Sequence, residues 1–371
     1  MNAVPRRRVL EVMFSFRIGG SELMGLELAS QLAAEGVDVM CTALDGMQGP
    51  LVQRCLDAGV RVVDLGLPRR GLLSRNGMSL DLARRLRELK LDAIHLQHFL
   101  GLNKLGLPAR LAGVPRIVVT EHSVLDVSQS LAGRLRVRAT SGLAHAITVI
   151  HPSIRDYLVQ ALGVDAGRIT VIPVGVDFAR WQAADRAERR AALGLHAEFT
   201  AVFAGRIAPV KNVPGLIRCF LDAAQASGVP SRLIVVGDGP DMGAARAAAT
   251  GHALAEQVVF AGEQADTRPF VAAGDVFLMN SLSEGTPRAL LEAMACGLPG
   301  ISTAVGGVPS LLEQRGWLTP PGDAPALTAA LIEAMRSPAQ VAARGQRARE
   351  FVQANFDARQ ALAGYRSLLF P

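Results

Sequence analysis

The sequence predicts an α/β protein with two doubly wound domains, and three observations support this prediction. Short apolar strand patterns alternate with amphipathic helix patterns, which is typical of parallel sheets covered by helices on both faces. The alternation occurs in two series, and the second begins near residue 198. A chain of 371 residues, 50% hydrophobic and 19% charged, is long and apolar enough to form two cores.

The elements follow in order along the chain. A strand pattern at 8–16 leads into a helix pattern at 21–36 that ends at Gly36, and the next strand pattern is 37–44. Further strands of the same sheet are expected at 61–67, 91–97, 116–122 and 144–150. The second series predicts strands at 198–205, 231–239, 257–262, 275–281 and 297–303. We therefore expect domains at 1–172 and 173–354, with a terminal helix over 355–371 that packs back on the first domain.

The charge of the chain is uneven. Residues 1–175 hold 21 Lys and Arg against 15 Asp and Glu, whereas residues 176–371 hold 18 of each kind, so the excess of +6 lies in the first half. A basic half predicts an anionic partner, such as membrane headgroups, a lipid-linked phosphate or nucleic acid. The densest clusters are at 68–70 and 133–138, and solvated helix faces or loop tips are the alternative explanation for each. Aromatic residues make up 5% of the chain and do not interleave with the basic runs, which disfavours nucleic acid.

The cellular location of the protein and the redox state of its cysteines are predicted from patterns that the sequence does not contain. No apolar run approaches the roughly 18 residues of a membrane span, and the N-terminal stretch does not have the pattern of a signal peptide. We expect a cytoplasmic protein, with the inner face of the cytoplasmic membrane as a second location. The cysteines are scattered without a CxxC pair, so we expect them to be reduced: Cys41, Cys55, Cys219 and Cys296.

Ligands of open α/β sheets bind beyond the C-terminal ends of the strands, so loops after strands are the candidate sites. In the loop 16–22, Gly19 and Gly20 permit a tight turn, and the helix that follows offers N–H groups to an anion. A plain turn is the alternative. In the loop 202–212, Arg206 and Lys211 leave the same strand end and suit two phosphate groups, with ordinary surface basicity as the alternative.

The stretch "EGTPRALLEAMACGLP" at 284–299 predicts a short helix. Thr286 is the expected N-cap and Pro287 the first helical residue. Gly297 is the expected end of the helix.

The two glutamates of this stretch differ in what they predict. Helical spacing buries Leu290 and puts Arg288 and Glu292 on the opposite side, so an exposed ion pair at i, i+4 would explain Glu292. Glu284 has no such explanation, because it lies in a polar loop directly after a strand. A carboxylate there suits sugar hydroxyls, and one in the next two turns could hold the two hydroxyls of a ribose.

Histidines gather near strand ends of the first half. His95, His98 and His122 do not have the spacing of a known ligand set, so we expect no metal. A single histidine at a strand end is a better candidate for a hydrogen bond to substrate. His145 precedes a strand and is expected to be structural.

Several separated motifs resemble one family. The stretch 283–313 resembles the C-terminal signature of the retaining GT-B glycosyltransferases of family 4, with Glu284 and Glu292 as its pair of glutamates and Gly306 and Gly307 beyond. "GRIAPVKN" is similar to the diphosphate-binding loop of that family, "VIPVGVD" to its linker and "IGGSE" to its first glycine loop. The resemblance runs from about residue 9 to residue 370 in the order of the family.

The resemblance implies two Rossmann-like domains facing a cleft, with an acceptor-binding first domain and a nucleotide-sugar-binding second domain. A hexosyl unit would pass from a nucleotide-diphosphate sugar to a hydroxyl acceptor, and both UDP sugars and GDP sugars such as GDP-mannose stay open as the donor. The basic first half suggests that the acceptor is lipid-linked or a polysaccharide, in envelope or exopolysaccharide synthesis. The resemblance implies catalytic roles for Arg206, Lys211, Glu284 and His122. Donor-binding roles would fall to Arg17, Gly19, Gly20, Gly205, Gly285, Thr286, Pro287, Arg288, Leu290 and Glu292. His98 is the acceptor-side candidate.

The sequence departs from the family in two places. Val174 replaces the usual Asn of the linker, and "EGTPRAL" replaces the commoner Phe-Gly run after the first glutamate, which changes the wall next to the sugar. No Asp-x-Asp pair is present, so neither a metal nor another cofactor is expected. A glycoside hydrolase would also use paired carboxylates, but the Arg206 and Lys211 loop disfavours it. A non-catalytic sugar-nucleotide-binding protein of the same fold is the other alternative.

Overall fold

The computed structural model describes residues 6–67, 76–123, 130–181, 186–196 and 198–371. The chain divides into two compact units, of which the first is 1–175 with 358–371 and the second is 176–357. The sequence predicts these boundaries after residues 172 and 354. The basic cluster at 68–70 lies outside the described residues.

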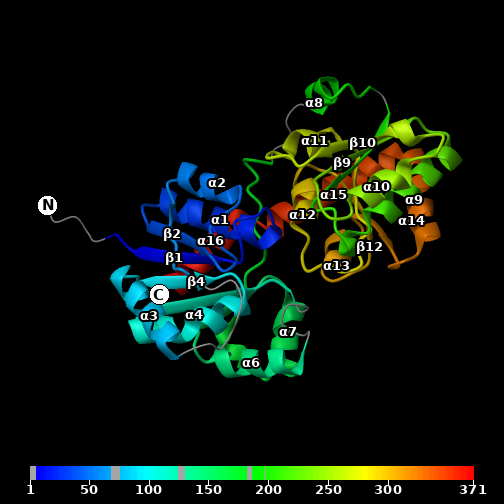
Figure 1. The fold of residues 1–371 in the computed structure, drawn as a ribbon. Coiled ribbons are helices and arrows are strands. Elements are labelled where there is room, and N and C mark those ends of the chain that lie inside the picture. Colours follow the sequence, from blue (N-terminus) through cyan, green and yellow to red (C-terminus); the bar gives the residue numbers. More distant parts are fainter. Residues whose placement is uncertain (1–5, 68–75, 124–129, 182–185, 197) are drawn as a thin grey trace. The chain divides into compact units, whose positions relative to one another are not determined.

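The described part of the first unit forms a parallel seven-stranded sheet in the order β3-β2-β1-β4-β5-β6-β7 (Figure 1). Its central strands are buried on both faces, as parallel strands covered by helices require, and their mostly apolar sequences also include His95, Thr120 and Thr148. The strands are β1 (Arg8–Met13), β2 (Asp38–Ala43), β3 (Arg61–Val62), β4 (Ala93–Leu96), β5 (Arg116–Glu121), β6 (Ala146–Val149) and β7 (Ile169–Val171). The helices are α1 (Gly20–Ala34), α2 (Leu51–Asp57), α3 (Asn76–Glu88), α4 (Phe99–Ala112), α6 (Leu131–Ser141), α7 (Pro152–Gln160) and α16 (Ala358–Leu369).

The second unit has a parallel six-stranded sheet in its described residues, in the order β10-β9-β8-β11-β12-β13. The strands are β8 (Phe199–Ala204), β9 (Ser231–Val236), β10 (Val258–Gly262), β11 (Val276–Leu278), β12 (Gly300–Thr303) and β13 (Gly316–Thr319). The helices are α8 (Arg186–Ala192), α9 (Val213–Ser227), α10 (Met242–Ala249), α11 (Arg268–Ala273), α12 (Arg288–Ala295), α13 (Val308–Leu312), α14 (Ala324–Arg336) and α15 (Pro338–Asn355). Short 3₁₀ turns lie at Ala166–Arg168, Pro209–Lys211 and Ala255–Gln257.

The prediction of two doubly wound parallel sheets is confirmed. The strands β7 and β13, however, were not predicted, because each is a short edge strand whose few residues carry little periodic signal. In the described residues no helix combines the length and apolarity needed to cross a membrane.

The terminal helix α16 packs on the first unit. Tyr365 of this helix is buried and lies 3.3 Å from Thr120 Oγ1 of β5. Arg116 Nε donates to the Leu368 carbonyl oxygen at 2.8 Å, and Arg366 pairs with Glu35 of the first unit at 2.7 Å. The end of the chain is thereby held by a buried hydroxyl and by two charged side chains.

Both sheets reverse their strand order at one point, which is where ligands of doubly wound sheets bind. In the first unit this switch point lies between β1 and β4, and in the second between β8 and β11. The loops that follow these four strands are therefore the expected ligand-binding loops.

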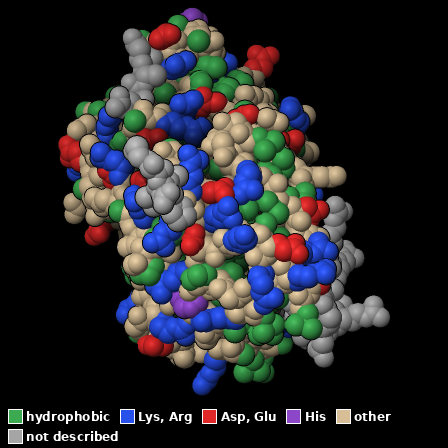
Figure 2. All heavy atoms as spheres, turned by 90° about the vertical axis from the view of Figure 1, so that its left-hand side faces the viewer, with side chains coloured by type: hydrophobic (Ala, Val, Ile, Leu, Met, Phe, Trp, Pro, Cys, Tyr) green, Lys and Arg blue, Asp and Glu red, His purple; other side chains and the backbone are tan. Residues whose placement is uncertain are grey.

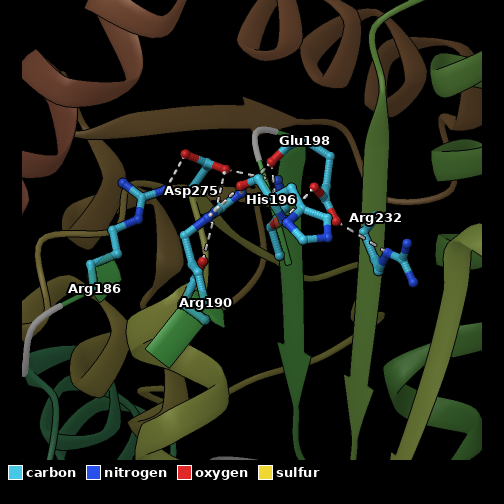
Figure 3. Close-up of polar contacts among 8 residues, drawn as sticks. Arg186, Arg190, His196, Glu198, Arg232 and Asp275 are labelled. Atoms are coloured by element: carbon cyan, nitrogen blue, oxygen red, sulfur yellow. Dashed lines mark hydrogen bonds and ion pairs between the residues drawn. The ribbon is translucent and has the colours of Figure 1, made fainter. Parts of the chain in front are cut away.

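A polar network lies at the opposite ends of the strands of the second unit (Figure 3). Asp275 accepts hydrogen bonds from Thr200 N at 2.7 Å and from Arg190 at 3.4 Å, and it also pairs with Arg186. Figure 3 shows that α8 supplies both arginines, which point toward Asp275. Because the network lies before β8 and β11 rather than after them, we assign it to the attachment of α8.

Candidate functional site

The backbone of the loop after β8 packs directly against the backbone of the loop after β9. Gly205 has φ 154° and Gly237 has φ 134°, and a Cβ at Gly237 would lie 2.0 Å from the Gly205 carbonyl oxygen. Gly239 approaches the Ile207 carbonyl oxygen in the same way, with a distance of 2.3 Å. Glycine is required at these contacts because only it combines the backbone angle with the close approach. The pairing holds the loop that carries Arg206.

Arg206 is exposed at the C-terminal end of β8. Its guanidinium has no hydrogen-bond or ion-pair partner among the described residues, so its donors are available to an anion. Lys211 follows in the same loop and lies 2.5 Å from Glu284 Oε1. The predicted pair of cations is therefore present on one loop, with one cation free and the other held by a carboxylate.

The Lys211–Glu284 ion pair bridges the switch point of the second unit. Glu284 lies on the loop after β11, and its side chain is 8% exposed against 27% for Lys211. Ser281 Oγ donates to the same carboxylate oxygen at 2.6 Å. The Leu282 N–H also donates to the Val210 carbonyl oxygen at 2.8 Å, so a backbone bond joins the two loops beside the ion pair.

The loop that carries Glu284 accepts hydrogen bonds from β12 and from the turn after it. Thr303 Oγ1 donates to the Ser281 carbonyl oxygen at 2.6 Å, and Gly307 N donates to the Gly285 carbonyl oxygen at 2.8 Å. Gly306 has φ 53°, and a Cβ there would lie 1.9 Å from the Glu284 carbonyl oxygen. Glycine at position 306 thus allows the turn to touch the backbone of the glutamate loop.

The start of α12 differs from the prediction. The N-cap residue is Pro287, with an extended ψ of 108°, and Arg288 is the first helical residue. Thr286 is therefore not the cap, because an extended proline follows it and no side-chain hydrogen bond caps this helix. The Thr286 hydroxyl is buried without a partner among the described residues. A buried hydroxyl in that state is a group that a ligand would satisfy. Gly297, with φ 83°, follows the helix where its end was expected.

The prediction that Arg288 and Glu292 form an exposed pair is wrong in one respect. Arg288 Nε lies 2.7 Å from Glu292 Oε1, but the two side chains are 9% and 14% exposed. Helical spacing alone does not reveal this burial, because it depends on packing against other parts of the fold. Leu290 is fully buried, as its helical spacing predicts, and its N–H donates to the Pro287 carbonyl oxygen.

The glycine loop of the first unit has an extended rather than a left-handed backbone. Gly19 has φ −155° and is the N-cap of α1, and Gly20 is the first helical residue with open space where a Cβ would lie. A Cβ at Gly19 would lie 2.3 Å from a carboxylate oxygen of Glu22. Arg17 is exposed in the same loop. The backbone at this helix start is thus uncovered at Gly20, with the Glu22 carboxylate beside it.

His98 and His122 come together after β4 and β5, with ring centroids 5.0 Å apart. Between them Glu121 accepts from the N–H groups of Phe99, at 3.2 Å, and His122, at 2.9 Å. His98 Nδ1 lies 3.7 Å from Glu121. Burial lowers the pKa of His122 well below its ordinary value, and the neighbouring His98 and His95 lower it further. At neutral pH His122 is an uncharged imidazole.

The other two histidines of the first half are held by the fold. His95 is buried inside β4, with Nδ1 2.8 Å from Glu11 and Nε2 2.7 Å from Thr120 Oγ1. His145 accepts from Ile117 N at 2.9 Å, so its structural role is confirmed. In the described ranges no three His, Cys, Asp or Glu side chains are grouped as metal ligands would be.

Sequence reasoning missed the groups that hold these side chains in place. Ser281 and Glu121 lie beside predicted site residues but were not named as candidates. Glu11 and Gln97 contact the histidines of the first unit from β1 and from the end of β4. The available signal was the charged residue in the middle of an otherwise apolar strand, "RVLEVM".

Residues 18–180 match the family model described as Glycosyltransferase Family 4, and residues 198–337 match the one described as Glycosyl transferases group 1. D-inositol 3-phosphate glycosyltransferase of Rhodococcus erythropolis is 30% identical over 323 residues, which cover 78% of this chain and 72% of that protein. The chain belongs to glycosyltransferase family 4.

The chain is also similar to other known proteins. UDP-Gal:alpha-D-GlcNAc-diphosphoundecaprenol alpha-1,3-galactosyltransferase of Escherichia coli is 30% identical over 243 residues, which cover 62% of each chain. Four further curated relatives match over 42% to 48% of their own length. The crystal structure of Anabaena HepE in complex with UDP and glucose has a TM-score of 0.83 at 20% identity, covering 98% of this chain and 99% of that one. This last likeness supports the fold of the family.

Proposed function

We propose that this family 4 glycosyltransferase is a retaining hexosyltransferase that uses a nucleotide-diphosphate sugar. The observation that carries the proposal is the Lys211–Glu284 ion pair at the switch point of the second unit, with the free Arg206 on the same loop as Lys211. Two cations there suit a diphosphate, and a carboxylate beside them suits sugar hydroxyls. The HepE structure in complex with UDP and glucose makes a UDP sugar the first donor to test.

The chemistry of the proposal follows from charge. Cleavage of the bond between sugar and diphosphate leaves extra negative charge on the diphosphate and positive charge on the sugar ring. Arg206 and Lys211 would stabilise this state more than the bound donor, which is the condition for catalysis. The buried Thr286 hydroxyl lies in the same loop as Glu284 and would donate to the bound donor. Because side chains supply this positive charge, we expect turnover to persist in EDTA.

Retention is part of the proposal and rests on membership of the family. The acceptor hydroxyl would attack from the face that the diphosphate leaves, and a phosphate oxygen would take its proton. Glu292 would hold the ribose, although in this structure its carboxylate is paired with Arg288. His122 would contact the transferred sugar, with His98 on the acceptor side.

Donor binding is tested by thermal stabilisation. UDP, GDP, ADP and their sugar conjugates are added to the wild type, Arg206→Ala and Glu292→Ala. A ligand at 100 times its Kd should stabilise the wild type by about 2.7 kcal/mol, and each substitution should weaken this effect. Loss of the shift in both variants supports the donor site. Equal shifts in all three proteins would remove Arg206 and Glu292 from it. Binding without turnover toward any acceptor would favour the non-catalytic alternative.

We also propose that the acceptor is lipid-linked and that α6 of the first unit touches the membrane. The helix exposes Leu131 at 74% and Leu135 at 60%, one turn apart, with Arg134 and Arg138 exposed beside them. It contains the basic run 133–138, and Ser130 caps its start by accepting from Gly133 N. Figure 2 shows Lys and Arg, Asp and Glu, and hydrophobic side chains mixed over the face that it displays. A basic helix with exposed leucines suits an anionic lipid surface.

Co-sedimentation with vesicles tests this contact. We expect the wild type to bind phosphatidylglycerol vesicles at low salt and to be released at high salt, because each Lys or Arg near such a surface contributes about 1 kcal/mol. The double variant Leu131→Ser with Leu135→Ser should lose most of the binding. Leu56→Ser, which alters a leucine 50% exposed on α2, is the matched control. Equal binding by all three proteins would contradict a role for α6.

A further inference from the structure

A network of buried polar side chains crosses the first unit and branches at Glu11 of β1. One branch runs through Gln97 to His122. The other runs through His95 of β4 to Thr120 of β5, which contacts Thr148 of β6 and Tyr365 of α16. The buried members are Glu11, His95, Gln97, Thr120, Thr148 and Tyr365. Polar groups buried to this degree are costly unless each has a partner, so the directions of their hydrogen bonds are tightly constrained.

Glu11 determines which groups donate and which accept in this network of hydrogen bonds. Its carboxylate accepts one hydrogen bond from His95 Nδ1 at 2.8 Å and a second one from Gln97 Nε2. A carboxylate only accepts, so it must face the N–H groups of the Gln97 amide. The amide of Gln97 therefore cannot be turned the other way round without opposing two oxygens.

The Gln97 carbonyl then determines which nitrogen of His122 carries the proton. Gln97 Oε1 lies 2.7 Å from His122 Nε2, and a carbonyl oxygen accepts only. Nε2 must therefore be the N–H nitrogen, which leaves Nδ1 of the neutral ring as an acceptor. Within the described part of the chain no group hydrogen bonds to His122 Nδ1.

Helix α1 closes over the Glu11 and Gln97 pair. A Cβ at Gly25 of this helix would lie 3.1 Å from Glu11 Oε1 and 3.2 Å from Gln97 Nε2. Glycine at this position lets the helix backbone approach the pair closely, which leaves little room for another rotamer of either side chain. The geometry of the pair is thus held by packing as well as by hydrogen bonds.

We propose that Gln97, oriented by Glu11, is a positioning residue that holds His122 in the Nε2–H form and presents Nδ1 as a hydrogen-bond acceptor for a hydroxyl of the sugar. This inference rests on the proposed function, which assigns His122 to the transferred sugar. It adds to the proposed function which partner of that contact donates the hydrogen bond and which accepts it. A ligand group that meets His122 must be a donor, so a hydroxyl is suited and a phosphate or carboxylate oxygen is not.

The direct test is ¹⁵N NMR of the imidazole nitrogens, which distinguishes the protonated nitrogen of a neutral ring from the bare one. The His122 signals are assigned by their loss in His122→Asn. We expect the Nε2–H form in the wild type. Glu11→Gln keeps the size of the side chain but can both donate and accept, so the Gln97 amide can turn over and the Nδ1–H form should become populated. Gln97→Leu should likewise lose the fixed form.

Kinetics supply the second readout, with a control from the same network of polar groups. Thr148→Val alters a threonine that lies 2.6 Å from Thr120 but contacts neither Gln97 nor His122. Gln97→Leu and Glu11→Gln should lower kcat/KM by about 10- to 100-fold, by analogy with the loss seen when the partner that orients a metal-ligating histidine is removed. Thr148→Val should keep both the Nε2–H form and the wild-type kcat/KM.

The outcomes separate this inference from the proposed function. A wild-type spectrum with the proton on Nδ1 would overturn the inference whatever the rates. A changed tautomer in Glu11→Gln with an unchanged kcat/KM would overturn the positioning role. An equal loss of activity in Thr148→Val would reduce Gln97 to a general structural role and overturn the inference as well. Absence of turnover in the wild type with all donors contradicts the proposed function instead, and the spectrum still decides the tautomer.

Discussion

Arg206→Ala is expected to lower kcat by about 100- to 1000-fold, the range for removal of one donor that stabilises charge in the transition state. Arg206 is exposed at the end of β8, and its guanidinium has no partner among the described residues. Its donors are therefore available to a leaving diphosphate without first breaking an ion pair. Because the negative charge grows as the bond breaks, kcat should fall more than KM rises. The measurement is the initial rate of nucleotide release at saturating donor and acceptor.

The matched control for this prediction is Arg186→Ala. Arg186 belongs to the same unit and pairs with Asp275, but at the opposite ends of the strands (Figure 3). Arg186→Ala changes the net charge of the protein by the same amount as Arg206→Ala, so it controls for long-range electrostatic effects. We expect kcat of Arg186→Ala to be close to that of the wild type. Equal losses in the two variants would show that the charge of Arg206 acts at a distance rather than on the leaving group.

Gly306→Ala is expected to abolish donor binding and to destabilise the second unit. The added Cβ would lie 1.9 Å from the Glu284 carbonyl oxygen, so the loop with Glu284 has to move. The left-handed backbone at φ 53° adds about 1–2 kcal/mol for a residue other than glycine. Movement of this loop would separate Glu284 from Lys211 and Ser281. The melting temperature should fall, and the stabilisation by the nucleotide should be lost.

Gly228→Ala isolates the cost of backbone strain from that of the contact. Gly228 ends α9 with φ 67°, close to that of Gly306, and has open space where a Cβ would lie. We expect this variant to lose stability by the strain term alone and to keep the shift produced by the nucleotide. If Gly306→Ala also kept that shift, the contact with the Glu284 backbone would not matter for the donor site.

The sequence predicts the positions of Arg206 and Glu284 better than it predicts the start of α12. Arg206 and Glu284 were chosen because each follows an apolar strand, and both lie at the C-terminal ends of strands that flank the switch point. The cap of α12 was assigned to Thr286, and this was wrong. N-cap preferences are statistical, and the extended Pro287 moves the helix start to Arg288.

The ion pairs and buried networks were beyond the reach of pattern reasoning. Lys211 and Glu284 are 73 positions apart, and Gln97 and Glu11 are 86 positions apart. Neither pair has a periodic signature. Glu11 was read as part of a strand, and only the parallel pairing of β1 with β4 brings it opposite His95.

The sequence by itself determined the fold class, the loops that can meet a ligand and the kinds of chemical group in them, because strand and helix periods and residue types are local properties. Only the tertiary structure decided which of those groups touch. It joined Lys211 to Glu284, buried the Arg288 and Glu292 pair, and set Gln97 between Glu11 and His122. The physical reason is that such contacts depend on which strands are neighbours and on their register, and both are settled by packing between distant segments.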